Sequence, residues 1–130
     1  MTTFKVKGGL KLSGEIHPQG AKNEALQVLC AVLLTSDEVI MENIPEIRDV
    51  NILINLLKDL NVRVEKKSSS SYIFQANNVD VNYLSSEDYK EKSSSIRGSI
   101  MMIGPLLARF GKGFIPRPGG DKIGRRRLDT

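Results

Sequence analysis

The stretch AKNEALQVLCAVLL, residues 21–34, decides how we expect the chain to fold. Its apolar residues recur at intervals of three and four, the period of a helix that packs one face against a core. Small apolar residues widen that face, so we expect a helix from Ala21 to about Leu34 that is almost completely buried. The face consists of Leu26, Leu29, Cys30 and Leu33, widened by Ala25, Val28 and Val32.

Lys22 and Asn23 fall in the first turn of this helix. The free backbone N–H groups and the positive end of the helix dipole favour acidic side chains there, so a lysine is mildly unfavourable. The position becomes favourable if an anion binds between the lysine and the helix end. A solvent-facing lysine without a ligand is an equally good interpretation of these residues alone.

Strand and helix patterns alternate on both sides of this helix. Apolar residues that alternate around Gly8-Gly9 predict an N-terminal hairpin within residues 1–21. Downstream, the expected elements are a strand at 39–41, a helix capped by Asp49 and ending at Asn61, strands at 62–64 and 72–74, and a further strand at 79–81.

The last helical pattern runs from Ser95 to about Phe110, and the Gly104-Pro105 pair must kink or break it because proline lacks a backbone N–H. A short strand is expected at residues 114–115. The order of elements predicts an α/β (α+β) fold built from a repeated unit whose second copy is incomplete.

A second candidate site lies in GKGFIPRPGGDKIGRRRLD, residues 111–129. Its Pro-Gly-Gly turn lets the backbone approach a ligand closely. Asp121 follows this turn, and Lys122 and the arginines at 125–127 come next. A carboxylate among cations is either their counter-ion in a solvated basic tail or an acid placed beside an anionic substrate.

The composition limits the class of ligand. The chain has 130 residues, 40% of them hydrophobic, which suits one domain with a single core. Its net charge of +4 is small, and it has no Trp, three Tyr and four Phe. A local basic cluster with few aromatics favours a phosphorylated small molecule. A small basic nucleic-acid-binding module remains the alternative.

The single cysteine, Cys30, excludes an intrachain disulfide, and its apolar neighbours predict a buried thiol. One His and one Cys give no zinc pattern, so we expect no metal or other cofactor. The N-terminal residues contain no apolar signal sequence and no apolar run is long enough to span a bilayer. We therefore expect a cytoplasmic protein with no membrane partner.

Five motifs are dispersed along the chain: GGLKLSGE at 8–15, GAKN at 20–23, RGS at 97–99, GPLLARFGKG at 104–113 and PGGDKIGRRRLD at 118–129. They resemble those of the enolpyruvyltransferase family, in the branch that starts peptidoglycan synthesis, the UDP-N-acetylglucosamine 1-carboxyvinyltransferases. The resemblance covers nearly the whole chain with consistent spacing. The sister branch, which makes 5-enolpyruvylshikimate 3-phosphate, has Lys-Ser where this chain reads Lys22-Asn23.

The resemblance implies a fold and a reaction. The family fold is an inside-out α/β barrel of repeated βαβαββ units, here incomplete. Residues 1–21 would be a hairpin that belongs to the other domain, and residues 22–130 the first part of the catalytic domain. The reaction transfers the enolpyruvyl group of phosphoenolpyruvate to the 3-hydroxyl of UDP-N-acetylglucosamine and releases phosphate.

The resemblance also implies roles for individual residues. Lys22 and Asn23 would contact phosphoenolpyruvate and the sugar, Arg97 would be the arginine of the substrate site, and Arg126 would hold phosphate. Asp121 falls at the proton-donor position, which is cysteine in most members. The residues expected to cradle the uridine nucleotide are Arg126, Arg127, Leu128, Asp129 and Thr130, with Arg127 in place of a common proline.

Family members are more than three times as long as these 130 residues. The family's general base and a further phosphate-binding arginine would therefore lie beyond Thr130. We expect the isolated 130 residues to be inactive and to self-associate through exposed apolar faces. The expected partners are phosphoenolpyruvate and UDP-N-acetylglucosamine, without nucleic acid.

Because Asp121 has no reactive thiolate, an enzyme with this sequence should resist epoxide inhibitors such as fosfomycin, which alkylate the family's cysteine. Intact mass after incubation with the epoxide should show no adduct, whereas an Asp121→Cys variant should gain one. An adduct on Asp121 itself would contradict this prediction.

Overall fold

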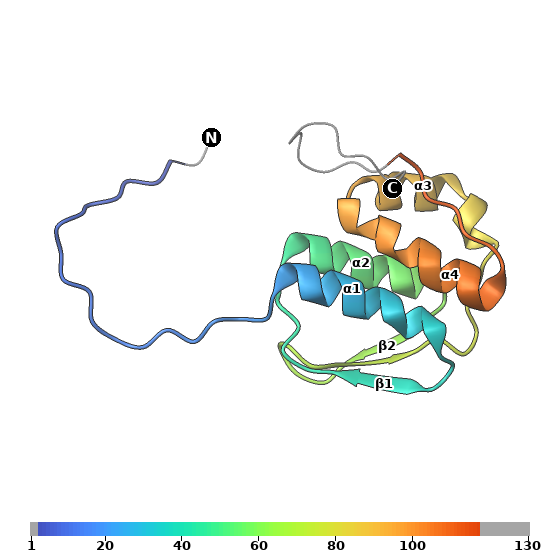
Figure 1. Ribbon diagram of the computed structural model, residues 1–130, viewed down its shortest axis with the longest axis horizontal. Helices are drawn as coiled ribbons and strands as arrows, with labels where there is room; N and C mark the ends of the chain where they lie inside the picture. Colours follow the sequence, from blue (N-terminus) through green and yellow to red (C-terminus); the bar gives the residue numbers. More distant parts are fainter. Residues whose placement is uncertain (1–2, 118–130) are drawn as a thin grey trace.

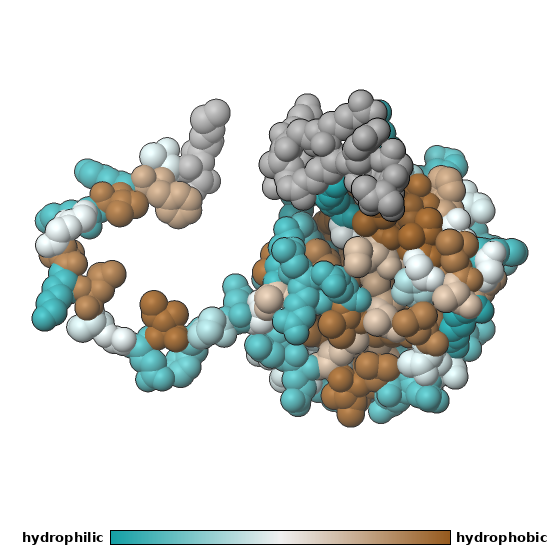
Figure 2. All heavy atoms as spheres, viewed as in Figure 1, coloured by the Kyte–Doolittle hydropathy of each residue, from teal (hydrophilic) through white to brown (hydrophobic). Residues whose placement is uncertain are grey.

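The computed structural model describes residues 3–117, an α/β body preceded by an extended arm (Figure 1). The arm, residues 3–21, contains no helix or strand. The predicted hairpin is absent from residues 3–21, where Phe4 and Leu12 are 89% and 91% exposed. Figure 2 shows apolar residues at intervals along the arm. The assignment of this segment to another domain stays a prediction.

Three short strands form the sheet: β1 (Glu38–Met41), β2 (Arg63–Lys66) and β3 (Tyr72–Gln75). Their order is β1-β3-β2, and β3 is antiparallel to both neighbours. Phe74 lies opposite Val39 on one side and Val64 on the other. The predicted strands at 39–41 and 72–74 and the hairpin joining β2 to β3 are confirmed.

Two helices cover one face of the sheet. The predicted helix at 21–34 is present as α1 (Lys22–Ala31), continued by the 3-10 helix η1 (Val32–Leu34). The second helix, α2 (Arg48–Asp59), lies beside α1 (Figure 1). The buried face of α1 is narrower than predicted, since Val28 is 44% exposed.

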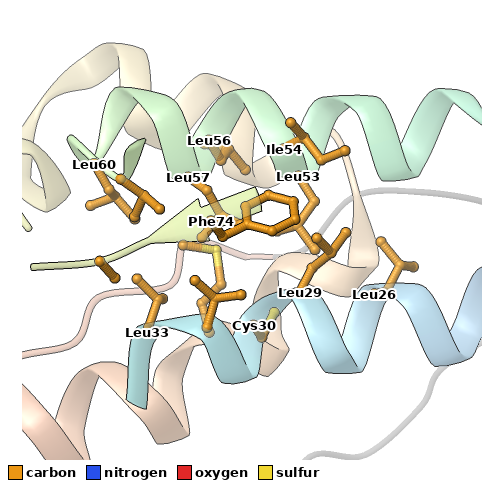
Figure 3. Packing of buried hydrophobic residues seen from close by; sticks show 14 of the residues in the cluster. Leu26, Leu29, Cys30, Leu33, Leu53, Ile54, Leu56, Leu57, Leu60 and Phe74 are labelled. Carbon is orange, nitrogen blue, oxygen red and sulfur yellow. The ribbon is translucent and has the colours of Figure 1, made fainter. Parts of the chain in front are cut away.

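The core lies between these helices and the sheet. Leucines of α1 and η1 meet those of α2 around the Phe74 ring, as Figure 3 shows. Burying side chains of this size stabilises a fold by roughly 1.5–3 kcal/mol each. The fully buried residues labelled in Figure 3 are Leu29, Leu33, Leu53, Leu56, Leu57, Leu60 and Phe74.

The start and end of α2 differ from the prediction. Ile47 is the N-cap, and Asp49 is the second residue of the helix, so Asp49 as a cap is wrong. The helix ends at Asp59, two residues before Asn61, which has a positive φ of 64°. Asparagine tolerates this left-handed conformation better than most residues.

The last helical region contains two helices instead of one. The 3-10 helix η3 (Arg97–Met102) is followed by α4 (Ile103–Phe110), so the change falls before Gly104. Pro105 is the third residue of α4, where a backbone N–H would have no acceptor within that helix. Proline therefore fits in the first turn of α4.

A helix that the apolar pattern did not predict precedes this region. The 3-10 helix η2 (Tyr83–Ser85) leads into α3 (Glu87–Ser94), whose N-cap Ser86 accepts a hydrogen bond from the backbone N–H of Tyr89 at 3.0 Å. A serine followed by two acids is a normal helix start. The strands predicted at 79–81 and 114–115 are absent from the structure, and both segments are irregular.

Arg109 of α4 joins three distant parts of the chain. Its Nη1 donates to the carbonyl oxygens of Leu33 at 3.1 Å, Thr35 at 2.7 Å and Ala76 at 2.8 Å. These carbonyls lie at the end of η1 and just after β3. The guanidinium therefore donates hydrogen bonds to carbonyl oxygens at the ends of a helix and a strand, where regular secondary structure provides no donor.

Replacing Arg109 with Ala should lower the free energy of unfolding by about 1.5–3 kcal/mol, because hydrogen bonds from a charged donor are lost together. Denaturant unfolding followed by circular dichroism measures the change. Lys112→Ala removes the same charge from an exposed position nearby and should have almost no effect. Equal effects of the two substitutions would show that only charge matters.

Candidate functional site

Lys22 is the first residue of α1, and the N-cap Ala21 supplies no side-chain hydrogen bond to the helix end. The Lys22 Nζ lies 2.5 Å from Oδ2 of Asp49, in the first turn of α2. Both side chains are partly exposed, 46% for Lys22 and 33% for Asp49. The ion pair thus joins the N-terminal ends of two helices at the protein surface, and Asn23 lies exposed beside it.

Arg97 begins η3, which packs along α1. A Cβ added to Gly98 would lie 2.9 Å from Cδ1 of Leu26, so this turn approaches α1 closely. Leu26 is four residues after Lys22 and therefore on the same side of the helix. The structure thus places the turn that carries the half-buried Arg97 beside the N-terminal half of α1.

Ser99, the third residue of the RGS motif, has a structural role. It is fully buried, and its hydroxyl donates to the backbone carbonyl of Ser93 at 2.6 Å and is also within 2.8 Å of the carbonyl of Ile96. Of the three residues of the motif, only Arg97 therefore presents a functional group that a ligand can reach.

Gly20 fixes the backbone just before α1. A Cβ at this position would lie 1.9 Å from the carbonyl oxygen of Asn43 and 3.1 Å from Cδ of Pro45. No side chain fits there without moving the backbone between β1 and α2. The GAKN motif therefore combines a packing glycine with a lysine at the helix end.

A surface cleft of about 450 Å³ lies between α1, β1 and the segment before α1. Its walls contain Glu24, Glu42, Gln19 and Asn43 together with apolar side chains such as Val28 and Ile40. Lys22, Asn23 and Arg97 do not line it. Two carboxylates make this cleft a poor site for an anion, so the cations and the cleft are separate features.

The second candidate stretch lies mostly outside the described residues. Its proton-donor and nucleotide-binding predictions therefore remain predictions. They concern Asp121, Arg126, Arg127, Leu128, Asp129 and Thr130.

Among the described residues, metal binding would require a cluster of ligands, and thiol catalysis would require a reactive Cys30. No three His, Cys, Asp or Glu side chains of residues 3–117 form a group that could hold a metal ion. Burial raises the pKa of the Cys30 thiol to about 12, so it is not a nucleophile near neutral pH. Between residues 3 and 117, every helix is too short or too polar to cross a lipid bilayer.

Sequence reasoning missed a polar cluster at the end of α2. Lys92 Nζ lies 2.7 Å from carboxylate oxygens of both Asp59 and Asp88, and the Tyr83 hydroxyl donates to Asp88 at 2.6 Å. Hydrogen bonding to Asp59 and Asp88 raises the pKa of Lys92, and the hydrogen bond from Lys92 lowers that of Asp88. These groups satisfy one another and join α2, η2 and α3. The only sequence signal was the four-residue spacing of Asp88 and Lys92.

The comparison with known families decides what this chain is similar to. The family model of EPSP synthase (3-phosphoshikimate 1-carboxyvinyltransferase) matches residues 6–130. The chain belongs to this family. The match includes the motifs around Lys22 and Arg97 and the undescribed stretch after Arg117.

Relatives in the EPSP synthase family confirm the resemblance drawn from the motifs. Proteins named UDP-N-acetylglucosamine 1-carboxyvinyltransferase are 61% identical in Bacteroides fragilis (strain YCH46), 53% in Porphyromonas gingivalis and 42% in Borreliella burgdorferi, each over 130 residues. All of this chain is covered in each comparison. It spans 30% of the length of the first two relatives and 29% of the third.

A solved structure supports the predicted fold class. The enolpyruvyl transferase NikO from Streptomyces tendae superposes with a TM-score of 0.67 at 23% sequence identity. The superposition covers 80% of this chain and 23% of NikO. With its mixed helices and an unclosed three-stranded sheet, the chain has an incomplete α/β fold of the EPSP synthase family.

Gly20→Ala should destabilise the chain by about 1–3 kcal/mol, because the added methyl group clashes with the Asn43 carbonyl. Thermal or denaturant unfolding measures this loss. Gly8→Ala makes the same change in the unfolded chain, and its Cβ would meet nothing within 4 Å, so it is the matched control. A Gly20→Ala variant as stable as Gly8→Ala would contradict the close approach.

Proposed function

We propose that this chain forms part of an enzyme that transfers the enolpyruvyl group of phosphoenolpyruvate to the 3-hydroxyl of UDP-N-acetylglucosamine. The observation that carries this proposal is the cation at the α1 end, Lys22, held beside the turn that carries Arg97. Its surroundings suit the carboxylate and phosphate groups of phosphoenolpyruvate. The 61% identity to relatives named for this activity supports the same reaction.

The reaction needs three kinds of group. A general acid protonates the methylene carbon of phosphoenolpyruvate, a base takes the proton of the attacking sugar hydroxyl, and cations stabilise the charges of the addition intermediate. Elimination then removes a proton from the methyl carbon, breaks the carbon–oxygen bond to phosphate and regenerates the double bond, and phosphate leaves. We assign the cationic role to Lys22, Arg97 and Arg126, the sugar contact to Asn23 and the proton donor to Asp121.

Asp121 must be protonated when it acts, although its sequence neighbours are cationic. Bound phosphoenolpyruvate would neutralise those cations, and this would favour the protonated carboxyl group at the moment of transfer. The nucleotide part of the second substrate would lie along residues 126–130, from Arg126 to Thr130. A cytoplasmic location follows from substrates that are phosphorylated and soluble.

Part of the surface formed by α1, η1 and α4 is apolar and exposed. Val28, Leu34, Ile103 and Leu107 are 36–53% exposed on α1, η1 and α4, and Figure 2 shows apolar residues on this side of the body. Because exposed apolar patches favour association, we expect the 130 residues alone to self-associate. They span only 30% of the length of the relatives, so we expect no turnover from them alone.

The test uses a completed enzyme, in which residues 1–130 are joined to the part of the Bacteroides fragilis relative that this chain does not cover. It should release phosphate from phosphoenolpyruvate only when UDP-N-acetylglucosamine is present. Asp121→Asn should lower kcat at least about a hundredfold while nucleotide-sugar binding is retained, because only proton transfer is lost. Enzyme assay and calorimetry give the two readouts.

Asp37→Asn is the matched control, since this exposed aspartate bonds Thr35 and no other of the described residues. Full turnover by Asp121→Asn would remove its role as proton donor. If the completed enzyme is inactive and the chain retains oligonucleotides with a steep salt dependence, the nucleic-acid-binding alternative is favoured.

A further inference from the structure

Asp49, an acid that contacts Lys22, belongs to a different helix. Asp49 is the second residue of α2, where the helix dipole stabilises a carboxylate. Its Oδ2 is 2.5 Å from Lys22 Nζ, the first residue of α1. Asp49 thus sits on a helix end that favours it, while Lys22 sits on one that does not.

We propose that Asp49 is a positioning residue that holds the Lys22 ammonium in place for an anionic substrate. A lysine side chain has four flexible carbons, and the positive end of α1 repels its charge. The Asp49 carboxylate offsets that repulsion and restricts the ammonium to one place. An ammonium has three N–H donors, so it can bind Asp49 and an anion together.

Two packing contacts fix the distance between the N-terminal ends of α1 and α2. The carbonyl oxygen of Asn43, in the loop between β1 and α2, packs against Gly20, just before α1. The α1 and α2 helices also pack on the same buried core. The distance between the two helix ends is therefore set by backbone packing, and the ion pair depends on it.

Glu46 provides a matched control near the start of α2. It lies two residues before the helix and pairs with Lys66 at 3.8 Å. Glu46→Gln and Asp49→Asn each remove one negative charge near the start of α2. Only Asp49→Asn should change the behaviour of Lys22.

The pairing itself is tested on the 130-residue chain without any substrate. Limited acetylation of lysines, followed by peptide mass spectrometry, measures how fast each ammonium reacts. Lys22 should react at least about threefold faster in Asp49→Asn than in the unchanged chain or in Glu46→Gln, because its hydrogen bond to the carboxylate is lost. Equal rates in all three proteins would overturn the proposal.

The consequence for catalysis rests on the proposed function and is tested in the completed enzyme. Asp49→Asn should lower kcat/KM for phosphoenolpyruvate about tenfold to a hundredfold, because a displaced cation no longer meets the substrate. The KM for UDP-N-acetylglucosamine should change less than twofold, and the melting temperature less than about 2 °C, since a half-exposed ion pair adds little stability. Asp49→Glu, which keeps the carboxylate, should restore part of the loss.

A double substitution separates positioning from an independent role. In a Lys22→Gln background, Asp49→Asn should cause no further loss if Asp49 acts through Lys22. Additive losses, or a loss matched by a lower melting temperature, would overturn the proposal. If Lys22→Gln leaves turnover intact, the proposed function fails, whereas the labelling result still decides whether Asp49 positions Lys22.

Discussion

The burial of one face of α1 is the constraint on which the rest of the structure depends. Leu29 and Leu33 are completely buried against α2 and the sheet, while Leu26 meets the η3 turn at Gly98. This packing fixes the axis of α1 and therefore the place where its first residue, Lys22, emerges. Without it, the GAKN and RGS motifs, which lie far apart in the chain, would have no common location.

Most of the body could be predicted from the sequence because its elements bury apolar residues at regular intervals. The α1 and α2 helices and the strands around Val39 and Phe74 follow such patterns. The arm could not be predicted this way: its alternation matches a strand, but a strand needs a partner for its backbone and apolar face. The α3 helix was not predicted, because its main sequence signal is the polar N-cap Ser86 and apolar periodicity does not detect caps.

The candidate site was predictable in its residues but not in their arrangement. Lys22 is conspicuous in the sequence because a cation is unfavourable at a helix start. Asp49, which contacts it, instead looks like the cap of the next helix. Asp49 lies one helical position beyond the start of α2, and the alternation of apolar residues cannot locate a helix end that finely. Likewise, Ser99 shares a motif with Arg97 but points into the core, which only three-dimensional packing reveals.

The buried thiol of Cys30 sets an alkaline limit on the fold. In the unfolded chain its pKa is ordinary, 9.0, whereas burial raises it to about 12 in the folded chain. The contribution of Cys30 to stability is therefore complete below pH 9 and falls as the pH rises toward 12, because only the unfolded chain releases the proton in that interval. Each pH unit weakens the folding equilibrium by up to about tenfold.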